Sequence, residues 1–502
     1  MSPEWGSLPL LPLRCILDHL STEDAMAAMS TCRHWRSAIL LYEGRKETLR
    51  LRAKHLEKSL YLARVFRKHT RRLHLYLDCT EEDTDEFMNF VLPQFFDSAK
   101  LREIIFIGPS YIQQTHHMPV IKIKRILTES LIFKHLHCLQ RFGMLGCEMG
   151  IAKSDNERIT HKHLEYYSRP LTFSHEASPS DTVLSRCNTG LMVFSALQSV
   201  IVDYDHINTE ALETLSQLAT FSQLSLNVGY KRQQPYAPID WARAGARRLH
   251  VHVNIISLPH TKFDEVIENI LCEGMTLVSL KVLFCKSLYP PLIEHIVSVH
   301  KDTLQELVWA DCPYNSTDVY HRHHRPPRLA QVLSSSSSSL HRDTLQELVW
   351  ADCPYNSTDV YHRHHRPPRL AQYGMGNVNP FILLCWQCTQ LRRLVIHGYW
   401  IWQYDLLGFV RLRPSLERVE VSAIFARQDA FGDSHARVLA HDEPHRPNMQ
   451  LYQEMNEYTK FKWEWTPWPQ LHAGLRARST PQQRAAYVVR EVTASATASA
   501  VT

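Results

Sequence analysis

The chain has 502 residues, 44% of them apolar, so it can bury a large core, either as several compact domains or as one extended repeat array. Lysine and arginine outnumber aspartate and glutamate by only 56 to 51, and charges of both signs are interspersed, which argues against a general nucleic-acid binder. The sequence contains neither an apolar run long enough to span a bilayer nor a secretory leader pattern, so we expect a soluble protein of the cytoplasm, the nucleus or both.

The first predicted element is a short amphipathic helix within residues 8–20. Its apolar side chains recur at i, i+3, i+4 and i+7 and form one stripe, made of Leu13, Ile16, Leu17 and Leu20. Pro9 and Pro12 stand at or before its first turn, where a missing backbone N–H costs nothing. Ser21, followed three residues later by Asp24, is a start signal for a second helix. Trp35 lies one turn beyond the apolar side of that helix.

These segments resemble the F-box, a short helical motif. The resemblance rests on Trp5, Leu8-Pro9, Leu13, Ile16, Leu20-Ser21, Asp24, Cys32-Arg33 and Trp35-Arg36, and it departs at Leu17, where many F-boxes carry Phe. It implies that residues 1–42 form a three-helix F-box that binds Skp1 and, through Skp1, a cullin scaffold. The implied Skp1-binding residues are Leu8, Pro9, Leu13, Ile16, Leu17, Leu20, Cys32 and Trp35. The alternative is an ordinary helical hairpin that caps a larger domain.

Residues 43–72 are strongly basic, and we expect a linker helix there. The cations are Arg45, Lys46, Arg50, Arg52, Lys54, Lys58, Arg64, Arg67, Lys68, Arg71 and Arg72. Interleaved leucines favour a helix that packs one face and leaves its charges solvated. The alternative is a nucleic-acid-binding surface, whose affinity would fall steeply with salt.

A pattern of the form L-x-x-L-x-L recurs through residues 73–425. It begins at Leu101, Leu139, Leu197, Phe221, Leu277, Leu304, Leu391 and Leu416, with weaker copies around Leu73 and Leu249. Several neighbouring copies are spaced at the period of a leucine-rich repeat, in which a strand and a returning helix form each coil. Residues 209–218 are one predicted return helix, and the longer gaps at 109–135 and 153–196 are predicted loops.

We therefore expect an α/β fold in which the F-box is followed by an irregular leucine-rich-repeat solenoid, although a conventional α/β domain is the alternative. Pattern leucines would point into the core, and the residues between them would line a concave face suited to a partner. The candidate substrate-binding residues are His74, Trp309, His397 and Trp400.

One part of this region is duplicated. Residues 300–331 recur as residues 341–372 with the single change of Lys301 to Arg342, and a run of six serines, Ser334–Ser339, lies between the copies. A recent tandem duplication or a sequence error explains this better than ordinary divergence, and one copy should be extruded from the array. The repeated Tyr320–Pro327 run is His-rich, but its arginines and prolines favour a solvated loop over a metal site.

The cysteines number 12 and are scattered singly, so we expect reduced thiols. Cys385 and Cys388 have C-x-x-C spacing, yet no second pair stands nearby and the flanking residues are apolar, which favours structural thiols over zinc or redox chemistry.

The C-terminal part changes character after the last repeat copy. Residues 379–400 are similar to a stretch of one F-box-only subfamily. Within residues 426–502 the repeat pattern ends, Trp463, Trp465 and Trp468 could form a cap, and the composition from Arg476 onward predicts disorder.

No motif of a hydrolase nucleophile, a metalloprotease or a phosphate-binding loop is present in the sequence. We expect a non-catalytic chain with no cofactor and no metal, acting as the substrate-recognition subunit of an SCF (Skp1-cullin-F-box) E3 ubiquitin ligase. The alternatives are a leucine-rich-repeat scaffold that works without the ligase and a nucleic-acid binder that uses the basic helix.

Overall fold

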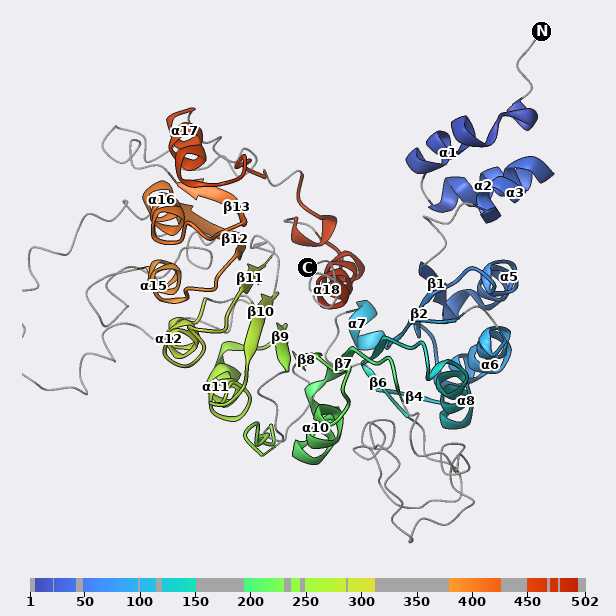
Figure 1. The fold of residues 1–502 in the computed structure, drawn as a ribbon, viewed down its shortest axis with the longest axis horizontal. Coiled ribbons are helices and arrows are strands. Elements are labelled where there is room, and N and C mark those ends of the chain that lie inside the picture. Colours follow the sequence, from blue (N-terminus) through green and yellow to red (C-terminus); the bar gives the residue numbers. More distant parts are fainter. Residues whose placement is uncertain are drawn as a thin grey trace, which may run out of the picture. The chain divides into compact units, whose positions relative to one another are not determined.

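The computed structural model describes most of the chain, and Figure 1 gives its elements. The described residues are 5–20, 22–41, 48–97, 100–113, 120–149, 194–229, 236–243, 249–285, 288–311, 379–425, 449–466, 470–476 and 479–494. Two compact units can be distinguished, the first comprising residues 1–110, 118–202 and 214–221 and the second residues 111–117, 203–213 and 222–502.

The N-terminal segment of the first unit is helical. Its elements are η1 (Trp5–Ser7), α1 (Leu10–His19), α2 (Thr22–Thr31) and α3 (Arg33–Leu41). The predicted apolar stripe supplies the interior, because Leu13 and Leu17 pack with Met29 of α2 and with Ala38 and Ile39 of α3. The apolar periodicity therefore predicted α1 and α2, whereas the third helix, α3, was implied by the resemblance.

A parallel sheet forms the rest of the first unit. Its strands pair in the order β1 (Thr48–Arg52), β2 (Arg72–Tyr76), β3 (Glu103–Ile107), β5 (Arg141–Leu145) and β7 (Ser199–Asp203). The helices α5 (Leu56–Phe66), α6 (Glu81–Val91) and α8 (Arg125–His135) follow strands along the chain, and α7 (Pro109–Gln113) begins in this unit and continues into the second. The strand β4 (Ile121–Ile123) pairs with β6 (Cys147–Met149) in a small second sheet. The pattern residues Leu73, Ile104 and Phe142 lie side by side in register and are buried.

Two expectations for this unit were wrong. Residues 48–52 of the basic segment form strand β1 and not part of a linker helix, because Leu49 and Leu51 alternate with cations at the period of a strand and pair with β2. Residues 109–135 form α7, β4 and α8 for most of their length, where we expected a loop, since Ile121, Ile123 and Leu131 supply buried apolar positions.

The second unit repeats the same architecture. Its parallel strands pair in the order β8 (Gln223–Gly229), β9 (His250–Ile256), β10 (Leu277–Leu283), β11 (Glu306–Ala310), β12 (Arg393–Trp402) and β13 (Arg418–Phe425). The helices α10 (Thr209–Ser216), α11 (Phe263–Asn269), α12 (Pro290–Val299), α15 (Pro380–Gln387) and α16 (Gln403–Leu412) cover one face (Figure 1). The buried rings of Trp309, Phe381 and Phe409 pack edge to face between that face and the helices.

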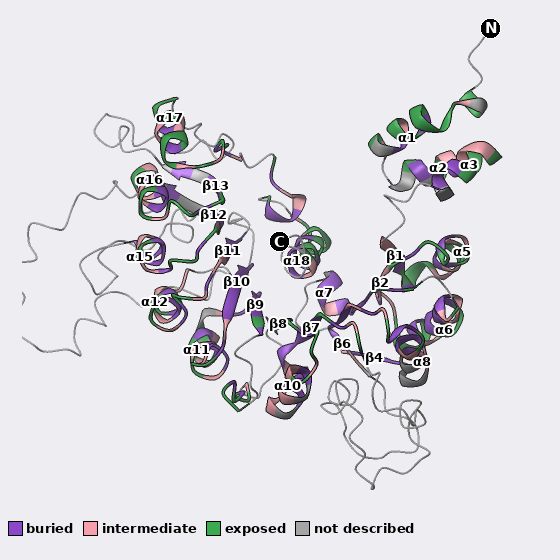
Figure 2. Cartoon of the chain, viewed as in Figure 1, coloured by how far each residue is buried: buried purple, intermediate pink, exposed green. Residues whose placement is uncertain are grey.

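Among the described residues, the last two apolar positions of each pattern copy named above lie on a strand. Leu224 and Leu226 lie in β8, Leu280 and Val282 in β10, and the other copies are placed likewise in β2, β3, β5, β7, β9, β11, β12 and β13. Figure 2 shows the strands largely buried and the outward sides of the helices exposed. An α/β chain whose strands pair in parallel is consistent with leucine-rich-repeat-like units.

The C-terminal segment folds back onto the second unit. It contains α17 (Met449–Tyr458), η11 (Ala473–Leu475) and α18 (Pro481–Ala494). The indole of Trp463, 1% exposed, donates to the carbonyl of Val419 in β13 at 3.2 Å. The prediction of disorder after Arg476 was wrong for residues 479–494, because Tyr487, Val488 and Val492 are buried in a regular helix.

The remaining predictions about insertions lie outside the described residues. The first duplicated copy supplies β11, whereas residues 312–378, which include the rest of that copy, the serine run, the His-rich runs and the second copy, are not described. The same holds for residues 153–193 and for Trp468. Within the described parts of the chain, no helix has both the length and the apolar character needed to cross a membrane.

Candidate functional site

The residues predicted to bind Skp1 fall into two classes. Leu13 and Leu17 are 0% and 1% exposed, so they hold α1 against α2 and α3 and offer no surface to a partner. Leu8, Ile16, Leu20, Cys32 and Trp35 are half-buried, and Pro9 is exposed. The second class could contact another protein without unfolding the helices.

Side chains of α3 fix the segment that precedes α1. The indole of Trp35 donates to the carbonyl oxygen of Trp5 at 2.7 Å, and a ring nitrogen of His34 lies 2.7 Å from the carbonyl oxygen of Leu8. The Arg36 guanidinium donates to the carbonyl of Met29 at 3.1 Å. The first two bonds join residues far apart in the sequence and hold the backbone before α1 in one position, whereas the third joins α3 to α2.

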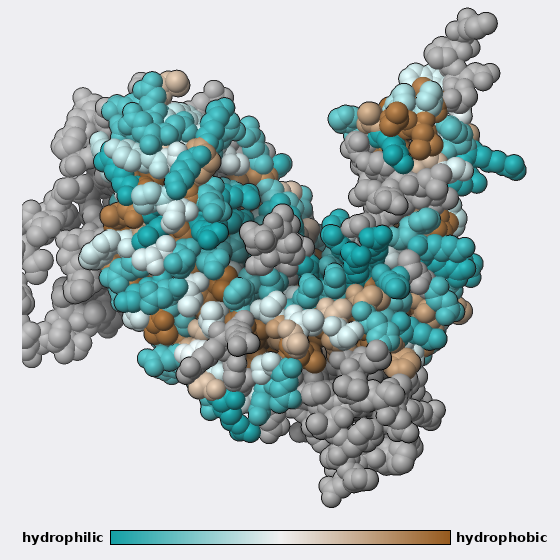
Figure 3. Space-filling view, in the orientation of Figure 1, coloured by the Kyte–Doolittle hydropathy of each residue, from teal (hydrophilic) through white to brown (hydrophobic). Residues whose placement is uncertain are grey.

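Three large apolar side chains of this segment remain exposed. Trp5 is 63% exposed, Leu10 39% and Leu11 74%, and Figure 3 shows apolar atoms gathered over α1. An apolar group of this kind beside polar residues marks a protein-contact surface. Leu10 and Leu11 were not among the predicted contacts. The sequence feature that could have identified them is a pair of adjacent leucines outside the buried stripe. A prediction based on the stripe alone does not include this pair.

The basic segment packs against these helices. Leu49 of β1 and Leu62, Val65 and Phe66 of α5 join the apolar cluster of the N-terminal helices. Arg52 pairs with Asp78 at 3.1 Å and lies over the ring of Tyr76, so one of the predicted cations is engaged within the fold.

The predicted substrate contacts are placed in different environments. His74 lies in the first unit, 6% exposed, with Nε2 2.5 Å from the carboxylate of Glu103, which also accepts from Arg141 at 2.8 Å. Burial alone would raise the pKa of Glu103, but the hydrogen bond from His74 and the charge of Arg141 outweigh it, so that pKa is lowered. The three side chains form one compensated charged group.

The other three candidates lie in the second unit. Trp309 is 1% exposed and packs against Phe381 of α15, so it has no surface for a substrate to contact; its pattern position points to the helices. His397 is 3% exposed, with Nε2 3.4 Å from the carboxylate of Glu420 on β13. Trp400 lies in β12, and its side chain is outside the described set.

Cys385 and Cys388 are both buried, and burial raises the pKa of Cys388 to about 12, which favours inert thiols. Among the described residues, no group of three or more histidine, cysteine or acidic side chains has the geometry to hold a metal ion.

Comparison with known proteins identifies the N-terminal helices. The F-box domain family matches residues 5–43. F-box only protein 33 of Homo sapiens is 47% identical over 47 residues, which are 9% of this chain and 8% of the relative. The same protein of Mus musculus is 49% identical over 39 residues, 8% of this chain and 7% of the relative.

The subfamily whose likeness we expected at residues 379–400 is F-box only protein 33, but both matches cover only the F-box region. The aligned stretch thus spans less than a tenth of either relative. The N-terminal helices of this chain are an F-box domain.

Proposed function

We propose that this chain is the substrate-recognition subunit of an SCF E3 ubiquitin ligase, acting in the cytoplasm, the nucleus or both. The observation that carries the proposal is the F-box match at residues 5–43, together with the exposed apolar side chains of that domain. An F-box implies binding to Skp1 and, through Skp1, to a cullin scaffold.

The contact with Skp1 would be mainly hydrophobic. Trp5, Leu10 and Leu11 would be removed from water against partner helices, with the half-buried Leu8 and Trp35 beside them. The bonds from α3 to the carbonyls of Trp5 and Leu8 fix this segment before binding, which lowers the entropy cost of association.

The parallel strands and their helices would form a leucine-rich-repeat solenoid that holds the substrate. In this role the chain raises the effective concentration of a substrate near the charged conjugating enzyme and contributes position without chemistry of its own. His74 and His397 remain candidate substrate contacts in this proposal.

Retention of Skp1 by the intact chain tests the proposal. Leu11 is 74% exposed and lies outside the apolar cluster, so Leu11→Asp should abolish Skp1 binding without unfolding the domain. Leu412→Asp, at a leucine of α16 that is 38% exposed, is the matched control and should bind Skp1 normally. Leu8→Ala combined with Trp35→Ala should also abolish binding.

Undiminished Skp1 retention by Leu11→Asp and by the double variant would contradict the proposal. Failure of the wild-type chain to retain Skp1 would instead favour an interaction scaffold that works without the ligase. For the basic segment we infer a structural role, since its apolar side chains pack on the F-box and Arg52 is paired with Asp78.

A further inference from the structure

The helix α18 occupies one face of the sheet in the second unit, opposite the face that carries α12, α15 and α16 (Figure 1). Lys281 of β10 is 1% exposed and donates to the carbonyl of Glu491 at 2.8 Å, and its Nζ lies 3.4 Å from the Glu491 carboxylate. Arg393 of β12 lies 3.8 Å from the same carboxylate. This part of the sheet is therefore covered by the chain itself.

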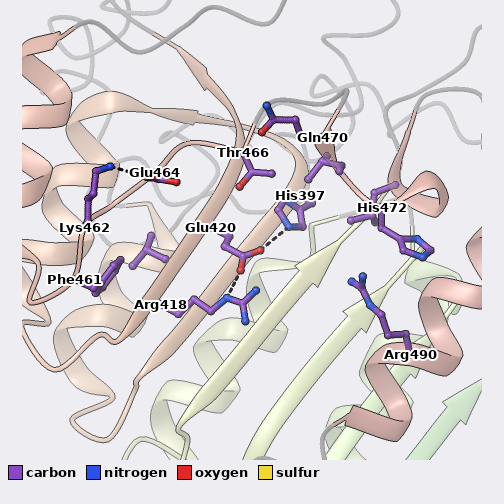
Figure 4. Close-up of a pocket in the computed structure, with 13 residues that line it drawn as sticks. His397, Arg418, Glu420, Phe461, Lys462, Glu464, Thr466, Gln470, His472 and Arg490 are labelled. Atoms are coloured by element: carbon purple, nitrogen blue, oxygen red, sulfur yellow. Dashed lines mark hydrogen bonds and ion pairs between the residues drawn. The ribbon is translucent and has the colours of Figure 1, made fainter. Parts of the chain in front are cut away.

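An open pocket of about 390 Å³ lies beside α18. It is lined by β12, β13, the segment after α17, the residues around η11, and α18 itself (Figure 4). Arg418 contributes from β13, His472 from the turn before η11 and Arg490 from α18, so residues distant in the sequence meet there. The volume suits one or two side chains of a peptide.

The acidic groups at this pocket already have partners. Glu420 interacts with His397 through one carboxylate oxygen and with the Nε of Arg418 through the other. Glu464 pairs with Lys462 at 2.9 Å. Glu491, next to the pocket, accepts from Arg490 at 2.9 Å as well as facing Lys281. The pocket therefore has few acceptor atoms to offer a ligand.

Donor groups remain available. Among the described residues, Arg418 uses only Nε and Arg490 only one terminal nitrogen, and Figure 4 shows their guanidinium groups pointing toward each other. His472 accepts from the backbone N–H of Gly474 through Nδ1, so its neutral ring carries the proton on Nε2 and can donate. The Nδ1 of His397 is buried at the pocket wall and has no hydrogen-bond partner among the residues that the structure describes.

We propose that this pocket binds the carboxylate side chain of an acidic peptide segment in a partner protein. Guanidinium groups match carboxylates in shape and charge, and the pocket's donors exceed its unused acceptors. The inference rests on the proposed function, since it places a substrate contact of the adaptor beside α18 and includes the candidate residue His397.

The test uses the full chain and calorimetric titration with acetyl-triglutamate amide. Triglutamate should bind, and the otherwise identical triglutamine should not. Arg418→Gln combined with Arg490→Gln should lower the triglutamate affinity at least about tenfold, because two charge-assisted contacts are lost. Arg418→Lys with Arg490→Lys keeps the charge and should give an intermediate affinity.

The matched control is Arg392→Gln combined with Arg411→Gln. These arginines are 54% and 50% exposed, close to the 59% and 52% of Arg418 and Arg490, and the control removes the same charge outside the pocket. It should leave the triglutamate affinity unchanged. Thermal unfolding of each variant verifies that the fold persists.

Equal affinity of the wild type and the Arg418→Gln, Arg490→Gln variant for triglutamate would overturn the proposal, as would equal binding of triglutamine. Complete displacement of triglutamate by inorganic phosphate at the same concentration would overturn the proposal that the ligand is a peptide. Skp1 retention is measured on the same proteins. If the wild-type chain retains Skp1 but triglutamate binding does not follow the expected pattern, only this inference is refuted. If the wild-type chain does not retain Skp1, the proposed function is refuted.

Discussion

Lys281 is a buried lysine whose ammonium group is surrounded by acidic side chains and a backbone carbonyl. It lies within 3.4 Å of the Glu491 carboxylate and 3.7 Å of the Glu306 carboxylate, and it also donates to a backbone carbonyl. Burial alone would raise the pKa of Glu491, but the charges of Lys281 and Arg393 lower it. The group is stable only as a set, because each buried charge compensates another.

Removal of one charged side chain of this set should therefore lower the free energy of unfolding more than removal of an oppositely charged pair. Lys281→Ala leaves Glu491 undercompensated and should lower the free energy of unfolding by about 3 kcal/mol or more. Lys281→Met combined with Glu491→Gln removes both charges and should cost less. Denaturant unfolding of the full chain measures both, and a double variant less stable than Lys281→Ala would contradict this account.

Histidines of the second unit predict a pH dependence. Burial lowers the pKa of His252 and of His300 to about 4, from an ordinary value of 6.5. The unfolded chain therefore binds more protons than the folded one between these values, so stability is present above pH 6.5 and is lost as pH falls toward 4. His252→Gln should flatten the stability curve in this window. The measurement is unfolding at stepped pH, and an unchanged slope would contradict it.

Glu420 should make the stability depend on pH in a lower pH range. Burial would raise its pKa, but the hydrogen bond from His397 and the charge of Arg418 bring the pKa to about 2, below the ordinary 4.5. Its stabilisation is present above pH 4.5 and is lost as pH falls through 2. Glu420→Gln should reduce the acid sensitivity below pH 4.5 while leaving the higher window unchanged, as stepped-pH unfolding would reveal.

Individual elements were predictable where their residues are neighbours in the sequence. The leucine pattern located the strands because each strand carries its own alternation, as Leu224 and Leu226 do in β8. Strand β1 was missed because its Leu49 and Leu51 alternate with cations. The high positive charge of residues 43–72 favoured a solvated linker helix over the strand that this alternation indicates.

The helix α18 was missed for a different reason. The sequence from Arg476 onward is rich in small and polar residues, although α18 itself carries a buried apolar face that includes Tyr487, Val488 and Val492. It is stabilised by contact with Lys281, a residue 210 positions earlier, which no local pattern reveals. Tertiary packing thus overrode a composition that favours disorder.

A pair of substitutions in α18 tests whether it is part of the folded core. Val488 is 0% exposed and Ala486 is exposed in the same helix. Val488→Asp buries an unpaired charge and should lower the unfolding free energy by at least about 3 kcal/mol. Ala486→Asp adds the same charge to water and should have a small effect. Equal, small effects in thermal and denaturant unfolding would show that α18 contributes little.

For the molecule as a whole, the two candidate contacts belong to different compact units. The F-box lies in the first unit, and the pocket beside α18 is formed entirely by the second. The F-box residues are close in sequence, so their site could be predicted; the pocket combines residues 397–490 and could not. Its residues become neighbours only after the strands have paired and the C-terminal segment has folded back.

We expect the two contacts to be thermodynamically independent. Saturating triglutamate should change the affinity for Skp1 by less than about twofold, since coupling requires an element whose two states both ligands bias. Titration of Skp1 into the chain with and without the peptide measures this. A larger shift in affinity would reveal coupling between the units.

The late position of α18 has a consequence for shortened forms of the protein. A polypeptide that stops before Pro481 retains the entire F-box but lacks the carboxylate that compensates Lys281 and Arg393. Under the proposed function, such a product would still bind Skp1, whereas its altered second unit would no longer hold a substrate. Under that function, premature termination near the end would yield a competitor of the intact subunit, whereas termination within the first helices would remove the Skp1-binding domain.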